Sequence, residues 1–275
     1  MINFLHNFNP NPIILDLGIV QLNWYGFFIS LGILVALLIS LSLGIKRGIK
    51  KEEILDISFW LIIFGVLGAR LYDVLLEIPF YIKNPFQIIK IWQGGLAIHG
   101  AIIAGVLTIF FISKKNNLNF WKISAIFAPG LALAQAIGRI GNYFNQELFG
   151  KATSLPWGIP IALENRPLEL INETHFHPTF IYESLGCLLI FFILLKINQT
   201  KAKSLKDSIV SYDYLVVALY MLLYSMLRFS LEFIRVDYSP VILGFKVPQI
   251  TSLLMAALAV FIIVNKYVFQ KKEKI

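Results

Sequence analysis

Seven long apolar stretches dominate the sequence and restrict what the chain can fold into. Each is long enough, at 1.5 Å per residue, to cross about 30 Å of membrane hydrocarbon as a helix. Hydrophobic residues make up 57% of the 275 residues and charged residues only 15%, which excludes a soluble or disordered chain. We therefore predict an all-α polytopic membrane protein with seven transmembrane helices, at Trp24–Gly44, Ile54–Ile78, Leu96–Ser113, Trp121–Ile140, Pro178–Leu195, Tyr214–Phe233 and Ile250–Val268.

The basic residues are divided unequally between the two sets of connections. Cytoplasmic loops are enriched in Lys and Arg, so the set with 15 of them is predicted to be cytoplasmic and the set with six extracytoplasmic. This places the N-terminus outside and the C-terminus inside. The 15 are Lys46, Arg47, Lys50, Lys51, Lys114, Lys115, Lys122, Lys196, Lys201, Lys203, Lys206, Lys266, Lys271, Lys272 and Lys274, and the six are Lys83, Lys90, Lys151, Arg166, Arg235 and Lys246.

Two segments between the predicted spans have a different character. Residues 79–93 are short and aromatic, with Asn84 at a helix N-cap and Pro85 at the first helical position, which predicts an interfacial arm on the outer membrane surface. Residues 151–176 are polar and rich in turn formers, which predicts a small extracytoplasmic head. The one cysteine, Cys187, excludes an intramolecular disulfide. No Lys or Arg precedes Lys46, so we expect no cleavable signal peptide.

Polar side chains gather at the outer ends of the predicted spans. A charge at bilayer depth costs about 2.5–3.5 kcal/mol, so such residues should line a cavity or form ion pairs, such as Arg228 with Glu232. The residues are Tyr25, Arg70, Asp73, His99, Arg139, Asn142, Glu147, His177, Tyr182, Glu183, Tyr224, Arg228, Glu232 and Arg235. The last four are separated by four, four and three residues, which predicts one shared helix face.

The segment Gly138–Gly150 carries the strongest single signal. Its glycines allow close backbone approach, Arg139 supplies a permanent cation with a fork suited to phosphate oxygens, and its asparagines supply neutral donors and acceptors. Small-residue spacing alone would indicate helix packing. With Arg139 present, the segment predicts a phospholipid headgroup site.

In several motifs the sequence resembles the prolipoprotein diacylglyceryl transferases of bacteria, in order along nearly the whole chain. Two positions depart from the family pattern: Ala101 replaces a second glycine after His99-Gly100, and Phe180 replaces the expected glutamine. The motifs are Trp24–Gly26, Gly68–Leu71, Trp92–Gly100, Gly138–Gly150, His177–Glu183 and the face of Tyr224, Arg228, Glu232 and Arg235.

The resemblance implies a reaction and a location. A diacylglyceryl group would pass from phosphatidylglycerol to the lipobox cysteine thiol of a secreted prolipoprotein, with release of glycerol 1-phosphate, without a cofactor or metal and with no nucleic acid as partner. The enzyme would be a multi-pass protein of the bacterial cytoplasmic membrane, with its active site towards the outer leaflet.

This chemistry needs a base for the thiol and a clamp for the phosphate. His99 is the base candidate because an ordinary histidine titrates near pH 6.5, although a structural role is about equally expected. Arg139 and Arg228 are the clamp candidates, unless they only pair with Glu147 and Glu232. The remaining predicted substrate-binding residues are Tyr25, Asn142 and Tyr224 in the polar wall, and Glu147, Gly150, Glu232 and Arg235, which shape or order it.

Two other classes of function remain open at this point. A transporter or channel needs polar groups through the full depth of the membrane, whereas the inner halves of the spans, such as 31–43 and 188–195, are nearly free of charge. A noncatalytic phospholipid-binding scaffold does not need arginines and a histidine at one depth. The sequence contains no Gly-x-Ser-x-Gly elbow, zinc-ligand pattern or P-loop.

Overall fold

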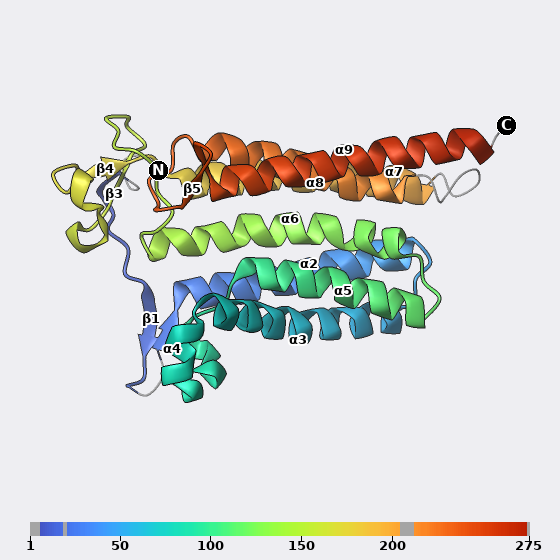
Figure 1. The fold of residues 1–275 in the computed structure, drawn as a ribbon, viewed down its shortest axis with the longest axis horizontal. Helices are drawn as coiled ribbons and strands as arrows, with labels where there is room; N and C mark the ends of the chain where they lie inside the picture. The colour runs from blue at the N-terminus through green and yellow to red at the C-terminus, as the bar shows by residue number, and fades with distance from the viewer. Residues whose placement is uncertain (1–5, 19–20, 204–211, 274–275) are drawn as a thin grey trace. The chain divides into compact units, whose positions relative to one another are not determined.

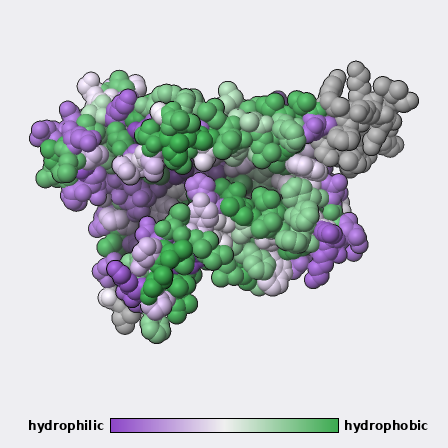
Figure 2. Space-filling model, viewed as in Figure 1, coloured by the Kyte–Doolittle hydropathy of each residue, from purple (hydrophilic) through white to green (hydrophobic). Residues whose placement is uncertain are grey.

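The computed structural model describes residues 6–18, 21–203 and 212–273. Side chains are described for all of these residues except 200–203 and 266–273. Seven helices in this part are long and apolar enough to span a membrane, which confirms the predicted fold class. They are α2 (Trp24–Lys46), α3 (Lys51–Leu76), α5 (Ile98–Lys115), α6 (Phe120–Phe144), α7 (Thr179–Lys203), α8 (Asp213–Leu231) and α9 (Val247–Glu273). Figure 2 shows hydrophobic side chains along the long helices on the face in view, as lipid contact requires.

Local signals at the helix ends explain several boundaries. After α2, Gly48 has φ +74° and the Ile49 N–H donates to the Gly44 carbonyl, a turn that a residue with a side chain adopts at a cost. At the start of α3, the Glu53 carboxylate accepts from the Lys50 backbone N–H. Before α6, the Asn119 side chain accepts from the Lys122 N–H.

The chain divides into two compact units, the first comprising Met1–Ile39 and Phe127–Ile275 and the second Ser40–Ile126. In the first unit, α8 packs against both α7 and α9 (Figure 1). Short antiparallel pairs lie between the helices: β1 (Ile13–Asp16) with β2 (Gln21–Asn23), β3 (Ile159–Pro160) with β4 (His175–Phe176), and β5 (Val241–Ile242) with β6 (Phe245–Lys246).

The predicted head, residues 151–176, folds as β3, β4 and two 3-10 turns, η3 (Leu163–Asn165) and η4 (Leu168–Leu170). It shares an apolar core with the ends of α6 and α7. Phe180, the residue in place of the expected glutamine, is 1% exposed in this core and lies 5.7 Å from the Tyr143 ring. Its packing explains why an apolar residue is accommodated there. The other core residues are Phe149, Ile159, Ile161 and Phe176.

The second unit contains α3, α5 and the predicted arm, 79–93, which folds as α4 (Ile78–Lys83), η1 (Pro85–Ile89) and η2 (Ile91–Gln93). Asn84 and Pro85 open η1 as predicted, but the turn is 3-10 and the Asn84 side chain donates back to the Phe80 carbonyl instead of capping it. Large apolar side chains of the arm are exposed, as an interfacial segment requires: Ile82, Phe86, Ile89 and Trp92. Its location at the outer surface stays a prediction.

Helices α3 and α5 pack side by side (Figure 1). Glycines lie where the two helices cross most closely. A Cβ at Gly68 would lie 2.4 Å from the Ala104 Cβ and 2.7 Å from the Gly100 carbonyl oxygen, whereas a Cβ at Gly65, one turn earlier, meets nothing within 4 Å. The crossing therefore depends on Gly68.

We expect Gly68→Ala to lower the stability of the protein in detergent by about 1–3 kcal/mol, the usual cost of overpacking. The matched variant Gly65→Ala should be neutral or stabilising, by up to about 1 kcal/mol, because alanine favours a helix over glycine. Thermal unfolding of the two variants measures the difference. Equal melting temperatures would contradict the tight crossing.

Candidate active site

Glu183, near the start of α7, is the acceptor that three helices share. Its side chain is fully buried, its Oε1 lies 2.7 Å from Arg139 Nη2 and accepts from the Tyr224 hydroxyl at 3.2 Å, and its Oε2 lies 3.4 Å from Arg235 Nη1. A carboxylate without water is stable only when it is paired and hydrogen-bonded. Arg139 of α6 and Tyr224 of α8 are therefore fixed by the same charge.

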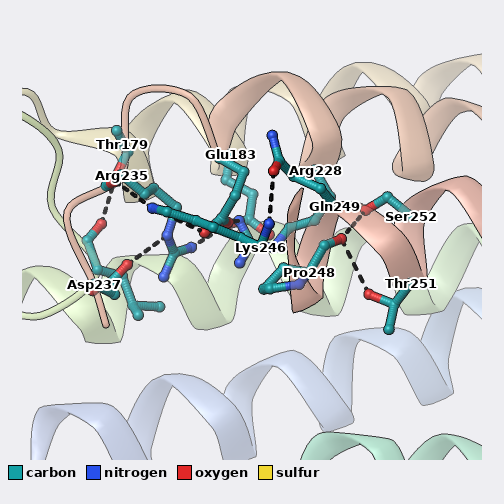
Figure 3. A network of polar contacts seen from close by, with 12 residues as sticks. Thr179, Glu183, Arg228, Arg235, Asp237, Lys246, Pro248, Gln249, Thr251 and Ser252 are labelled. Atoms are coloured by element: carbon teal, nitrogen blue, oxygen red, sulfur yellow. Dashed lines mark hydrogen bonds and ion pairs between the residues drawn. The ribbon is translucent and has the colours of Figure 1, made fainter. Parts of the chain in front are cut away.

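Arg235 is satisfied within the protein. Besides Glu183, its Nε lies 2.7 Å from Asp237, and its side chain is 5% exposed (Figure 3). The prediction that Arg235 shares a helix face with Arg228 is wrong, because α8 ends at Leu231. After α8 the backbone bonds to the start of the head instead. The Lys151 N–H donates to the Ile234 carbonyl, and Arg235 forms a β-bridge with Gly150.

A second ion pair lies at the C-terminal end of α8. Arg228 Nη1 is 2.7 Å from Glu232 Oε2, which confirms the pair expected from the sequence. The other oxygen of Glu232 lies 3.5 Å from Lys246 Nζ, and this ammonium also donates to the Arg235 carbonyl at 3.1 Å. Lys246 thus connects the Arg228 pair to the Arg235 pair (Figure 3).

Glu147 is held by amides and not by an arginine. Its Oε1 accepts from the side chains of Asn142 at 2.7 Å and Asn145 at 3.1 Å, while the side-chain Oδ1 of Asn142 accepts from Arg139 Nη1 at 3.2 Å. The alternative in which Arg139 pairs directly with Glu147 is therefore wrong. Asn142 bridges the two side chains, and Glu183 is the counterion of Arg139.

The backbone around Glu147 is strained. Gln146 and Leu148 have φ of +51° and +57°, in the left-handed region that glycine favours. Neighbouring groups hold this conformation: the Gln146 side chain accepts from the Ala162 N–H at 2.7 Å, and the Thr179 hydroxyl donates to the Leu148 carbonyl at 2.6 Å. The head therefore fixes the orientation of Glu147.

The glycines of the Gly138–Gly150 segment serve close packing. A Cβ at Gly150 would lie 2.8–2.9 Å from side-chain atoms of Thr179, His177 and Ile234, so this position joins the head to α7 and to the end of α8. A Cβ at Gly141 would lie 3.0 Å from the Tyr25 Cα. Tyr25 of α2 is thus placed against α6 by direct backbone approach.

His99 belongs to the second unit. It is the second residue of α5, its side chain is exposed, and its ring centroid lies 5.9 Å from that of Tyr72 on α3. No hydrogen bond or ion pair of the His99 side chain occurs among the described residues. Its ring nitrogens are therefore open to a substrate group.

Two permanent cations of the first unit keep donors for an anion. A guanidinium has five N–H groups, and Arg139 uses two of them in hydrogen bonds within the described residues. Arg228 contacts Glu232 through one nitrogen. Their side chains are 23% and 17% exposed, more than the 5% of Arg235. With Tyr224 and Asn142 as neutral neighbours, they can bind a phosphate group.

No group of His, Cys, Asp and Glu in the described part of the chain is arranged to hold a metal ion.

The family model described as prolipoprotein diacylglyceryl transferase matches residues 12–265. The chain belongs to this family. Several curated proteins that are similar to the chain carry the name phosphatidylglycerol–prolipoprotein diacylglyceryl transferase. One from Synechocystis sp. is 38% identical over 270 residues, covering 96% of this chain and 92% of its own.

Two further relatives of the same name are similar over most of their length. The relative from Thermosynechococcus vestitus is 38% identical over 89% of this chain and 88% of its own. The relative from Acaryochloris marina is 40% identical over 90% and 87%. As a member of the prolipoprotein diacylglyceryl transferase family, the chain is a transferase with several membrane-spanning helices.

Glu183 and Lys246 were not predicted as site residues. For Glu183 the sequence did carry a signal, because a carboxylate in an apolar span requires a cation. In the structure that cation is Arg139, which has no other carboxylate partner among the described residues. Lys246 was counted only as a loop charge, and its position follows from the β5–β6 hairpin, which the sequence did not reveal.

Proposed function

We propose that the chain transfers the diacylglyceryl group of phosphatidylglycerol to the lipobox cysteine thiol of a prolipoprotein and releases glycerol 1-phosphate. The family and the names of the relatives support this reaction. The single observation that carries the site is the pair of partly exposed arginines, Arg139 and Arg228, each held by a buried carboxylate and each keeping donors for a phosphate.

The reaction explains why arginines are needed. The thiolate sulfur attacks the glycerol carbon that bears the phosphate, so a carbon–sulfur bond forms and the carbon–oxygen bond breaks. The electron pair of that bond leaves with the phosphate, whose charge grows from −1 in the diester towards −2 in the monoester. Donors already aimed at the leaving oxygens stabilise this growing charge, most strongly where water is excluded.

We assign Arg139 and Arg228 to this clamp, with Asn142, Tyr224 and Tyr25 in the surrounding wall. The buried carboxylates have a different role: Glu183 and Glu232 orient the two arginines, since each is almost fully buried and already occupied. Arg235 and Gly150 order the wall through their contacts with Glu183 and with the head. Glu147 is held rigidly by amides with a strained backbone on both sides, which suits a residue that contacts substrate.

The substrate thiol has to lose its proton before it attacks, because an ordinary cysteine thiol titrates near pH 8.5 and the thiolate is the nucleophile. We assign this step to His99, whose ring nitrogens have no hydrogen-bond partner among the described residues. The proton passes from the thiol sulfur to a ring nitrogen as the carbon–sulfur bond forms.

The charge asymmetry of the loops supports an orientation in a bacterial membrane with the active site towards the outer leaflet. A reporter inserted near Glu169 should therefore read extracytoplasmic, whereas reporters fused after Lys206 and Lys274, which lie outside the described residues, should read cytoplasmic. Reporter activity in intact cells measures each position. A cytoplasmic reading near Glu169 would invert the topology.

The reaction itself is tested with purified protein, phosphatidylglycerol vesicles and a synthetic lipobox peptide. We expect release of glycerol 1-phosphate that depends on the peptide cysteine. Binding of phosphatidylglycerol with no release, over a range of detergents and lipid compositions, would favour a scaffold that only binds the lipid.

A further inference from the structure

Arg70 of α3 is buried against residues of the arm and bonds almost entirely to backbone. Its Nε donates to the Ile88 carbonyl at 2.9 Å, its Nη1 donates to the carbonyls of Gly94 and Gly95 at 2.8 and 2.7 Å, and its Nη2 donates to the Gln87 carbonyl. The side chain is 9% exposed. All four acceptors lie between residues 87 and 95, which we name the 87–95 loop.

This arrangement differs from that of Arg139 and Arg228. Four of the five guanidinium N–H groups of Arg70 are occupied by carbonyls, so little capacity remains for a phosphate. The nearby carboxylate of Asp73 lies 3.7 Å from Nη1 and provides the balancing charge. Arg70 thus belongs to a clamp for backbone and not to a clamp for lipid.

Asp73, Tyr81 and Gly95 complete the arrangement. The Tyr81 hydroxyl donates to Asp73 at 2.7 Å, and the Tyr81 ring lies under the Arg70 guanidinium at 5.1 Å. The bond to Asp73 raises the pKa of Tyr81 above its ordinary value. Gly95 has φ +73°, and a Cβ there would lie 2.2 Å from Arg70 Nη1 and 2.7 Å from the Asp73 carboxylate.

The 87–95 loop leads directly to His99, and α3 continues to hold the chain there. The Ala97 N–H donates to the Ala69 carbonyl at 3.1 Å, and a Cβ at Gly100 would lie only 2.1 Å from the Gly68 carbonyl oxygen. Tyr72 lies beside the His99 ring. One stretch of α3, residues 68–73, therefore contacts the chain before, at and after His99.

We propose that Arg70 is a positioning residue for His99, and that it acts by fixing the 87–95 loop from which α5 begins. The inference rests on the proposed function, in which His99 accepts the proton of the substrate thiol. A base displaced by about 1 Å can cost about 10²-fold in rate, so a loosened loop should lower turnover more than lipid affinity.

The test is a double-mutant cycle measured as transfer to a lipobox peptide. Arg70→Gln should lower kcat about 10²-fold, with the KM for phosphatidylglycerol changed far less. In the His99→Ala background the same substitution should have almost no further effect, because the group that Arg70 positions is already absent. The matched control is Arg166→Gln, which removes another guanidinium that donates to backbone carbonyls, those of Ile161 and Ile171. Its effect, whatever its size, should be the same in both backgrounds.

Two outcomes would overturn the inference and can be told apart. Equal fold losses from Arg70→Gln in both backgrounds would show a general structural role and leave the proposed function intact. Full activity of His99→Ala would remove the base role itself, and the positioning role with it.

Hydrogen exchange of the protein in detergent keeps the inference testable if Arg70→Gln does not fold. In Arg70→Lys, which keeps the charge but cannot reach four carbonyls, amide exchange should rise between residues 87 and 100 and stay unchanged between 104 and 113. Tyr81→Phe, which removes only the bond to Asp73, should give a smaller rise in the same segment. Unchanged exchange at residues 87–100 in Arg70→Lys would contradict the proposal that Arg70 fixes the 87–95 loop.

Discussion

Arg139→Lys should lower the transfer rate about 10²-fold while the protein still inserts and folds, because removing a preorganised donor from a developing charge costs about 10²–10³-fold. Lysine keeps the positive charge but loses the planar fork that contacts Glu183 and Asn142 and leaves donors for the phosphate. The measurement is kcat for transfer, together with phosphatidylglycerol binding and the melting temperature in detergent.

A double variant separates the two roles of this arginine. If Arg139 only neutralises its buried partner, Arg139→Gln combined with Glu183→Gln should be tolerated, because removing both members of a buried pair is often close to neutral and Arg235 keeps Asp237 as a partner. If Arg139 binds the lipid phosphate, the double variant stays inactive although it is stable. A stable and fully active double variant would contradict the phosphate role.

His99→Ala should slow transfer by about 10²- to 10⁴-fold, the usual contribution of a general base, and leave phosphatidylglycerol binding nearly unchanged. The measurement is kcat at saturating lipid, together with phosphatidylglycerol binding.

The control is His6→Ala, which removes a histidine of the first unit that bonds to the Gly158 carbonyl and stacks on His175. It should keep the wild-type transfer rate. Turnover of His99→Ala at the wild-type rate would assign His99 a structural role.

The sequence was sufficient for the transmembrane architecture because hydrophobic length is read directly along the chain. Each of the seven predicted spans corresponds to a long helix, with ends displaced by a few residues. The displaced ends depend on tertiary contacts. Helix α6 continues to Phe144, so Asn142 lies within it as Arg139 does. Helix α8 stops at Leu231 because residues 234 and 236 bond to the backbone at 149–151.

The site was predicted in its residue types but not in its pairing. The spacing on α8 identified the pair of Arg228 with Glu232, since both lie on one helix. The partner of Arg139 comes from another helix, 44 residues later in the chain, and spacing carries no information about such contacts. Glu147 was the nearer carboxylate in sequence, yet Asn142 and Asn145 occupy it. Arg70 was grouped with the other intramembrane charges, but its guanidinium donates to backbone carbonyls of residues 88 and 94.

We expect this one protein to break the glycerol–phosphate bond of phosphatidylglycerol and to form a thioether on a peptide cysteine. The direct measurement combines the purified protein, phosphatidylglycerol of one defined acyl composition and a lipobox peptide, and analyses both products by mass spectrometry. The peptide should gain one diacylglyceryl group on sulfur with no phosphorus, and one glycerol 1-phosphate should appear for each modified peptide. A matched peptide with serine in place of the cysteine should stay unmodified. Release of glycerol 1-phosphate without a modified cysteine, or a modified peptide that retains phosphorus, would contradict the account.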